Sequence, residues 1–244
     1  MMAKASHDLS GKLVLVTGAT RGIGRAVAVA AAGAGAEVII TGRTIGALEE
    51  VDDEIKEAGG HATIVELDMK DTPAMPRLAA AIAERWGRLD GFVANAAILT
   101  ALTPIGHVTP EDWDLNMAIN LTGQWHMIRA FDPLLRAAPA GRAILVTSGA
   151  AVGSCPFWGP YAATKAGLEA IGRSWAGESE KTALRINMLN PGATATTMRA
   201  SAFPGENPQS LPQPADITPA FLALLAEDCP YHGELIEARD LAGL

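Results

Sequence analysis

The sequence predicts a single α/β domain in which a doubly wound parallel sheet lies between two helical layers, a three-layer α/β/α sandwich. Short β-branched segments alternate with helical stretches along most of the 244 residues. The strand segments are apolar at successive positions, as expected when both faces of a parallel sheet are covered. Hydrophobic residues make up 49% of the chain, which is enough for the core of one large α/β domain.

The first five elements follow in regular order. Residues 12–18 (KLVLVTG) form a β-branched run ending in glycine, and the alanine-rich residues 25–36 favour a helix. A second β-branched run follows at 37–42 (EVIITG). Residues 45–59 have apolar side chains at helical spacing and end in glycines, and 61–68 (HATIVELD) form a third strand. Strands separated by helices of this length predict parallel βαβ units.

The same alternation continues through the middle of the chain. Residues 72–87 are typical of an amphipathic helix, and 89–97 (LDGFVANAA) of a strand. Residues 110–138 predict one long helix, and 141–148 (GRAILVTS) another buried strand. These elements continue the alternation of strand and helix that a doubly wound parallel sheet requires.

The last part of the chain completes the prediction of a Rossmann-type domain spanning residues 11–244. Residues 161–179 predict a helix and 184–192 a strand, whereas the polar residues 1–10 predict a flexible amino-terminal arm. A proline-rich segment at about 194–215 interrupts the alternation directly after a strand. Because ligands bind at the carboxyl ends of parallel strands, we expect this segment to be a substrate lid, with a plain surface loop as the alternative.

The composition of the chain indicates which kinds of binding partner and which cellular compartment to expect. The formal net charge is −8 and there is no basic cluster, which argues against nucleic acid or a membrane surface as partner. Cys155 and Cys229 are too few for a disulfide framework, and the first residues lack the apolar stretch of a signal peptide. The five histidines have no metal-ligand spacing, so no metal site is expected. These observations predict a cytoplasmic protein.

A glycine-rich turn directly follows the first predicted strand. The segment VTGATRGIG places Gly18, Gly22 and Gly24 between that strand and the next helix. Glycines at this position allow a tight turn and close approach of the backbone to a pyrophosphate, which the helix amino terminus then faces. An ordinary strand-to-helix turn would explain the glycines alone, but their place at the start of a βαβ unit favours a dinucleotide site.

The end of the second predicted strand indicates which dinucleotide binds. NAD-binding units usually carry an acidic residue there for the ribose hydroxyls. This chain instead has Gly42, Arg43 and Thr44, and Arg21 lies within the glycine turn itself. Two guanidinium groups at these loops suit a ribose 2′-phosphate, so NADP(H) is the expected cofactor.

The chain also has Tyr161 and, four residues later, Lys165. With this pair and the glycine turn, it resembles the short-chain dehydrogenase/reductase (SDR) family. The resemblance extends from about Leu13 to about Ala238. It departs from the family pattern at Ala97, where the segment VANAAI has alanine in place of the usual glycine. It implies hydride transfer between a nicotinamide and a carbonyl or alcohol substrate.

The resemblance also implies roles for individual residues. Tyr161 is expected to exchange a proton with the substrate oxygen, Ser148 to bond that oxygen, Lys165 to serve the phenol and the cofactor ribose, and Asn120 to hold a water. The expected cofactor contacts are Gly18, Thr20, Arg21, Gly22, Ile23, Gly24, Arg43, Thr44, Asp68, Met69, Asn95, Ala96, Tyr161, Lys165, Pro191, Gly192, Thr194 and Thr196. The expected substrate contacts are Ser148, Cys155, Phe157 and Tyr161.

Elementary chemistry supports the Tyr161 and Lys165 pair independently. Residues four apart share one face of a helix, and Pro160 suits the first helical position. A phenol with an ordinary pKa near 10 is a poor base at neutral pH, and a neighbouring ammonium is expected to lower that pKa.

Two other functions stay open from the sequence. One is a 3-oxoacyl thioester reductase, and the other a non-catalytic protein that senses dinucleotides. We expect a small-molecule carbonyl or alcohol substrate and a homodimer or homotetramer, because in the family the helices carrying Asn120 and Tyr161 pair between subunits.

Overall fold

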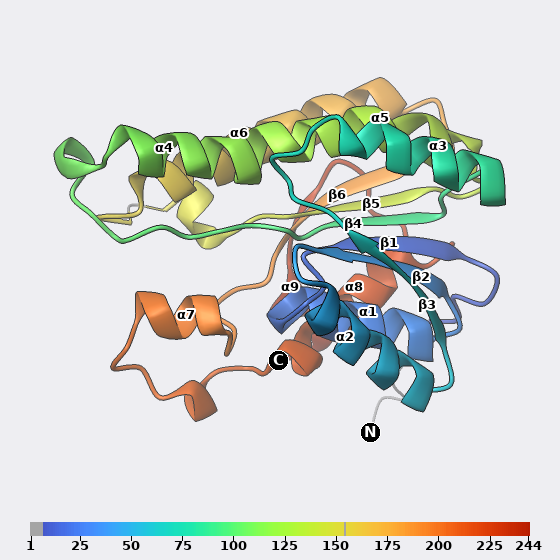
Figure 1. The fold of residues 1–244 in the computed structure, drawn as a ribbon, viewed down its shortest axis with the longest axis horizontal. Helices are drawn as coiled ribbons and strands as arrows, with labels where there is room; N and C mark the ends of the chain where they lie inside the picture. Colours follow the sequence, from blue (N-terminus) through green and yellow to red (C-terminus); the bar gives the residue numbers. More distant parts are fainter. Residues whose placement is uncertain (1–6, 154) are drawn as a thin grey trace.

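A computed structural model, which describes residues 7–153 and 155–244, contains one sheet between two helical layers (Figure 1). All seven strands are parallel, in the order β3-β2-β1-β4-β5-β6-β7. The strands are β1 Leu13–Thr17, β2 Glu37–Gly42, β3 His61–Glu66, β4 Gly91–Ala94, β5 Arg142–Val146, β6 Arg185–Asn190 and β7 Leu235–Glu237. This arrangement confirms the doubly wound α/β/α prediction.

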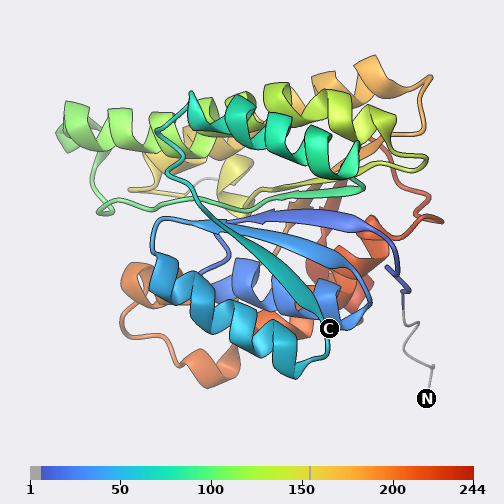
Figure 2. The same ribbon diagram turned by 45° about the vertical axis from the view of Figure 1, so that its right-hand side comes forward.

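The helices cover both faces of the sheet. They are α1 Gly22–Gly33, α2 Ile45–Glu57, α3 Ala74–Trp86, α4 Pro110–Met117, α5 Gly123–Ala137, α6 Gly159–Ser179, α7 Thr197–Ala202, α8 Thr218–Leu225 and α9 Ala238–Ala242. Helices α3 to α6 lie above the sheet in Figure 1, and α1, α2, α8 and α9 lie below it. Helix α7 stands apart from both layers at one end of the molecule in Figure 1, and in the turned view of Figure 2 its orange segment lies partly behind the lower helices.

Alternation along the strands divides the core between these two layers. In β1, Val14 and Val16 pack with α1 and α8 on one face, whereas Leu15 packs on the other with Phe92 of β4 and Phe131 of α5. Each buried apolar side chain of this size contributes about 1.5–3 kcal/mol. The two cores hold the sheet between its helices and leave the strand ends to the loops.

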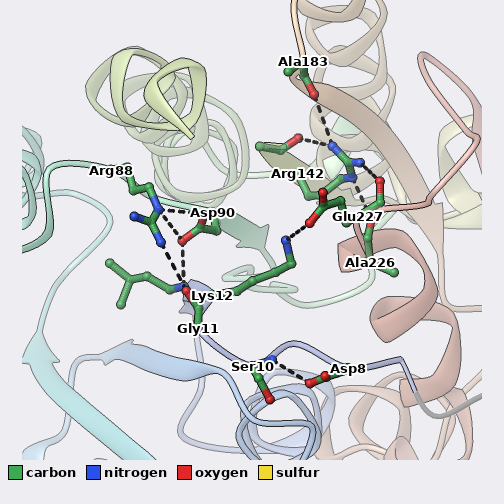
Figure 3. A network of polar contacts seen from close by, with 12 residues as sticks. Asp8, Ser10, Gly11, Lys12, Arg88, Asp90, Arg142, Ala183, Ala226 and Glu227 are labelled. Atoms are coloured by element: carbon green, nitrogen blue, oxygen red, sulfur yellow. Dashed lines mark hydrogen bonds and ion pairs between the residues drawn. The ribbon is translucent and has the colours of Figure 1, made fainter. Parts of the chain in front are cut away.

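A polar network closes the sheet at the amino ends of its strands (Figure 3). The buried Asp90 carboxylate accepts hydrogen bonds from the Leu13 amide at 3.0 Å and from Arg88 Nε at 3.0 Å. The buried Arg142 guanidinium donates to the carbonyls of Ala183 and Ala226. Burial lowers the Arg142 pKa, and these carbonyls satisfy the donors of a group that is costly to bury alone.

Three features differ from the sequence prediction. The helix expected over 110–138 is divided into α4 and α5 by a π-helical segment, Ala118–Thr122, a conformation that sequence periodicity does not reveal. Strand β7 and helices α8 and α9 were not predicted. The arm expected over residues 1–10 is ordered at its end, since Leu9 is fully buried and its amide donates to the Ala34 carbonyl at 2.8 Å; residues 1–6 lie outside the described part.

No helix in the described part of the chain has both the length and the apolar character needed to cross a membrane.

Candidate functional site

The candidate site is a cavity of about 480 Å³ at the carboxyl ends of the strands. It is lined by the loops that follow β1, β2, β3, β4, β5 and β6 and by the start of α6. The segment after β6 that contains α7 also lines it. Loops of parallel strands meet at this edge, so residues far apart in the sequence share one pocket.

The glycine turn after β1 is packed so tightly that side chains would not fit. Gly18 has a φ of +64°, and a Cβ there would lie 2.8 Å from the Ala96 Cα. A Cβ on Gly24 would collide with the Gly18 carbonyl oxygen. The Asn95 side-chain amide donates to the carbonyl of Thr17 at 2.8 Å and holds the turn against β4. The turn therefore presents bare backbone, and the amino terminus of α1, to the cavity.

Arginine side chains stand at the two loops where a ribose phosphate would bind. Arg21 and Arg43 both line the cavity, and α1 and α2, which start beside them, have no acidic residue in their first turns. Asp68, which follows β3, lines the same end. This arrangement suits the phosphate groups of a dinucleotide.

The proton-transfer candidates meet at the middle of the cavity. Tyr161 and Lys165 lie in the first two turns of α6, and Ser148 follows β5. Tyr161 is 8% exposed and Lys165 is 1% exposed. The Lys165 ammonium donates to the Val146 carbonyl at 2.7 Å and lies 5.6 Å from the centre of the Tyr161 ring. All three side chains contribute to the cavity lining.

Burial is the main cause of the pKa shifts of Tyr161 and Lys165. It raises the pKa of Tyr161 to about 12, and a hydrogen bond with Ser148 opposes that rise. It lowers the pKa of Lys165 to about 8. The sequence predicted a lowered phenol pKa; the structure differs because the desolvation of a buried phenolate outweighs its neighbours. Tyr161 therefore keeps its proton at neutral pH and can donate it.

Asn120 has a different environment from the other three residues. It lies in the π-helical segment and is 0% exposed. Its Oδ1 accepts from the Ile98 amide at 2.8 Å, and its Nδ2 donates to the Ile98 carbonyl at 2.9 Å. Its side chain also faces Thr164, the neighbour of Lys165. In the described structure these contacts use its polar groups, and Asn120 is not among the cavity-lining residues.

The loop between Ser148 and Tyr161 contributes Cys155 and Trp158 to the cavity. Phe157 has a φ of +75° and is 54% exposed. It lies outside the set of described residues that line the cavity, so the structure brings Cys155, but not Phe157, toward the substrate end.

The lid predicted over 194–215 contains a short helix and is tied at its base. Thr196 caps α7 by accepting a hydrogen bond from the Arg199 amide at 3.1 Å. The Ala195 amide donates to the Pro212 carbonyl at 2.9 Å and closes the segment into a loop. Met198, Arg199 and Phe203 of this segment line the cavity.

Most of the expected site residues lie around this one cavity. Those lining it are Gly18, Thr20, Arg21, Gly22, Ile23, Arg43, Asp68, Met69, Asn95, Ala96, Ser148, Cys155, Tyr161, Lys165, Pro191, Gly192, Thr194 and Thr196. Gly24, Thr44, Asn120 and Phe157 are not among its described lining residues. Ala97, which departs from the family pattern, does line it.

Two polar contacts at the wall of the cavity escaped the sequence analysis. Thr147 Oγ1 donates to the buried Glu169 carboxylate at 2.7 Å. Asn190 Oδ1 accepts from the amides of Gly149 and Gly192, at 3.1 Å each, and so joins the loop after β5 to the loop after β6. Glu169 lies two helical turns beyond Tyr161, a spacing that could have indicated its position on the same face of α6.

A family model for short chain dehydrogenases matches residues 12–207. The chain belongs to the short-chain dehydrogenase/reductase family. This confirms the resemblance drawn from the glycine turn and the Tyr161 and Lys165 pair. The SDR assignment also explains why a parallel sheet, a glycine turn and a buried tyrosine occur together.

Curated and solved SDR relatives cover most of the chain. The oxidoreductase YciK of Escherichia coli K12 is 38% identical over 223 residues, covering 90% of this chain and 88% of YciK. A short chain dehydrogenase of E. coli CFT073, solved in complex with NADPH, superimposes with a TM-score of 0.92 at 36% identity, covering 96% of this chain and 99% of that one. An NAD-dependent oxidoreductase of Mycobacterium tuberculosis H37Rv is 32% identical, covering 81% of this chain and 76% of its own length.

Proposed function

We propose that this SDR protein is an NADP(H)-dependent oxidoreductase that interconverts a small-molecule carbonyl compound and its alcohol, with Tyr161 as the proton donor or acceptor. The observation that carries the proposal is the buried Tyr161, four residues from Lys165, in the cavity that Ser148 and the glycine turn also line. Tight backbone packing at Gly18 and Gly24 fits a dinucleotide that lies against the turn.

NADP(H) is proposed over NAD(H) because of the charge at the strand ends. Arg21 and Arg43 line the cavity where NAD-binding domains usually present a carboxylate to the ribose. The related E. coli structure was solved with NADPH, whereas the M. tuberculosis relative is named NAD-dependent. The two arginines favour NADPH in this chain, since guanidinium groups bind phosphate bidentately.

Each polar side chain then has a definite task. The bound NADPH supplies a hydride equivalent. Ser148 orients the substrate oxygen by hydrogen bonding, and Tyr161, which holds its proton at neutral pH, donates it to the oxygen as the alcohol forms. Lys165 lies beneath the phenol, where its ammonium stabilises negative charge that develops on the Tyr161 oxygen.

We also propose that the enzyme acts in the cytoplasm. Both cysteines are free, with Cys155 exposed and Cys229 buried, as in proteins of reducing compartments.

A reductase screen tests the proposed function directly. The purified protein is mixed with NADPH and a panel of aldehydes, ketones and quinones, and the loss of NADPH is followed. We expect turnover with at least one class and much less with NADH. A protein that binds NADPH tightly but reduces none of the panel would instead favour a dinucleotide-sensing role.

A further inference from the structure

A chain of aromatic contacts leads from Tyr161 through Trp158 to Phe203, which belongs to another segment. Trp158, which directly precedes α6, lies edge-to-face with the Tyr161 ring at 5.7 Å between ring centres. Phe203, which directly follows α7 in the lid, stacks on the Trp158 ring, with 5.9 Å between ring centres and 30° between the ring planes. Both line the cavity. The lid thus meets the body of the enzyme through a pair of aromatic rings next to the proton donor.

The charged side chains of the cavity are concentrated away from these rings. Arg21, Arg43 and Asp68 belong to the loops of the cofactor end, and Lys165 lies beneath Tyr161. Beside the rings, the one further charged side chain among the described lining residues is Arg199.

Arg199 is already neutralised within the lid. Its guanidinium makes two hydrogen bonds to the Glu206 carboxylate, at 2.6 and 2.7 Å, and lies 3.7 Å from the Phe203 ring centre. An anionic substrate would have to bind Arg199 through two oxygens, and the Glu206 carboxylate already occupies both of those positions. Arg199 also covers one face of the Phe203 ring. This end of the cavity therefore offers aromatic surface from Trp158 and from the rest of Phe203, and no unpaired charge from its described lining residues.

We propose that the substrate is an uncharged ketone that carries a planar aromatic ring system, bound with its ring against Trp158 and Phe203 and its oxygen at Ser148 and Tyr161. The proposal rests on the reductase function proposed above and names its substrate class. Aromatic rings gain from offset or edge contacts with other rings beyond the area they bury, so an aromatic substrate is preferred over a saturated one of equal size.

A matched pair of ketones tests the preference. 4-(2-Naphthyl)butan-2-one and its fully saturated counterpart 4-(2-decalyl)butan-2-one share a carbon skeleton and an unconjugated ketone and differ in the aromaticity and flatness of the ring system. With NADPH, we expect kcat/KM of the wild type to be roughly tenfold higher for the naphthyl ketone, as two ring contacts would supply. Adding a carboxylate to the naphthyl ring is expected to reduce kcat/KM strongly.

Variants assign the preference to the two rings. Trp158→Leu and Phe203→Leu should each reduce the naphthyl-to-decalyl ratio by about two- to tenfold. Their NADPH affinity should stay near that of the wild type, which shows that the site is intact. Trp86→Leu is the matched control, because its indole lies at the end of α3 and bonds Glu37 near the opposite edge of the sheet. It should leave the ratio unchanged.

The outcomes separate this inference from the proposed function. Equal kcat/KM for the two ketones, or a ratio that both ring variants leave unchanged, overturns the aromatic assignment while the reductase function stands. If the enzyme reduces other ketones but neither member of this pair, the aromatic assignment is likewise overturned and the reductase function stands. No reduction of any carbonyl compound overturns both proposals.

Discussion

Replacing Lys165 with methionine probes the buried ammonium at the centre of the site. The change keeps the length of the side chain and removes its charge. Burial lowers the Lys165 pKa from the ordinary 10.5 to about 8. Since one pKa unit corresponds to about 1.4 kcal/mol, holding this group charged costs roughly 3 kcal/mol of folding free energy.

The sign of the pH dependence follows from proton counting. Between pH 8 and 10.5 the unfolded chain holds a proton on Lys165 that the folded protein has released, so wild-type stability rises with pH in that window. Lys165→Met lacks this rise. Ionisation of Tyr161, whose pKa is raised to about 12, destabilises both proteins above pH 10 and cancels in their difference.

Urea unfolding of both proteins from pH 7 to pH 10.5 measures this difference. The free energy of unfolding of the wild type, relative to that of Lys165→Met, should rise by about 3 kcal/mol between pH 7 and pH 10.5. Lys181→Met, which removes an exposed amine, controls for the loss of one charge. A difference between wild type and Lys165→Met that is the same at every pH would refute the claim that Lys165 is held in a desolvating site.

Three further predictions concern the cofactor and the assembly. Arg43→Ala should weaken NADPH binding about tenfold or more and NADH binding little, by fluorescence titration, and equal weakening of both would argue against a 2′-phosphate contact. Gly18→Ala, at a φ of +64°, should reduce both stability and NADPH affinity, whereas Gly46→Ala, whose Cβ meets nothing within 4 Å, should not. Light scattering at micromolar concentration should report a dimer or tetramer; a monomer would contradict the expected pairing of helices.

The parts of the fold carried by local pattern could be predicted from the sequence. Buried strands such as β1 and β5 are short apolar runs, and the glycine turn and the Tyr161 and Lys165 spacing are local as well. They place the proposed cofactor site and the proposed proton donor together because all parallel strands end at one edge of the sheet.

The remaining features depend on contacts between distant segments. The π-helical segment occurs where Asn120 bonds the backbone of Ile98, and nothing in the local sequence indicates that partner. Strand β7 has three residues, too few for a periodic signal. The pairing of Trp158 with Phe203 joins two segments 45 positions apart in the sequence, and only the folded chain reveals it.

Single-turnover reduction by Tyr161→Phe tests the central claim most directly. The substitution keeps the ring and removes the proton that the buried hydroxyl holds at neutral pH. The enzyme is preloaded with NADPH and mixed with a ketone that the wild type reduces, and NADPH fluorescence is followed. We predict that NADPH binds nearly as tightly as to the wild type and that the hydride-transfer rate falls by about 10²–10⁴-fold. A variant that keeps more than about half of the wild-type rate would contradict the assignment of Tyr161 as the proton donor.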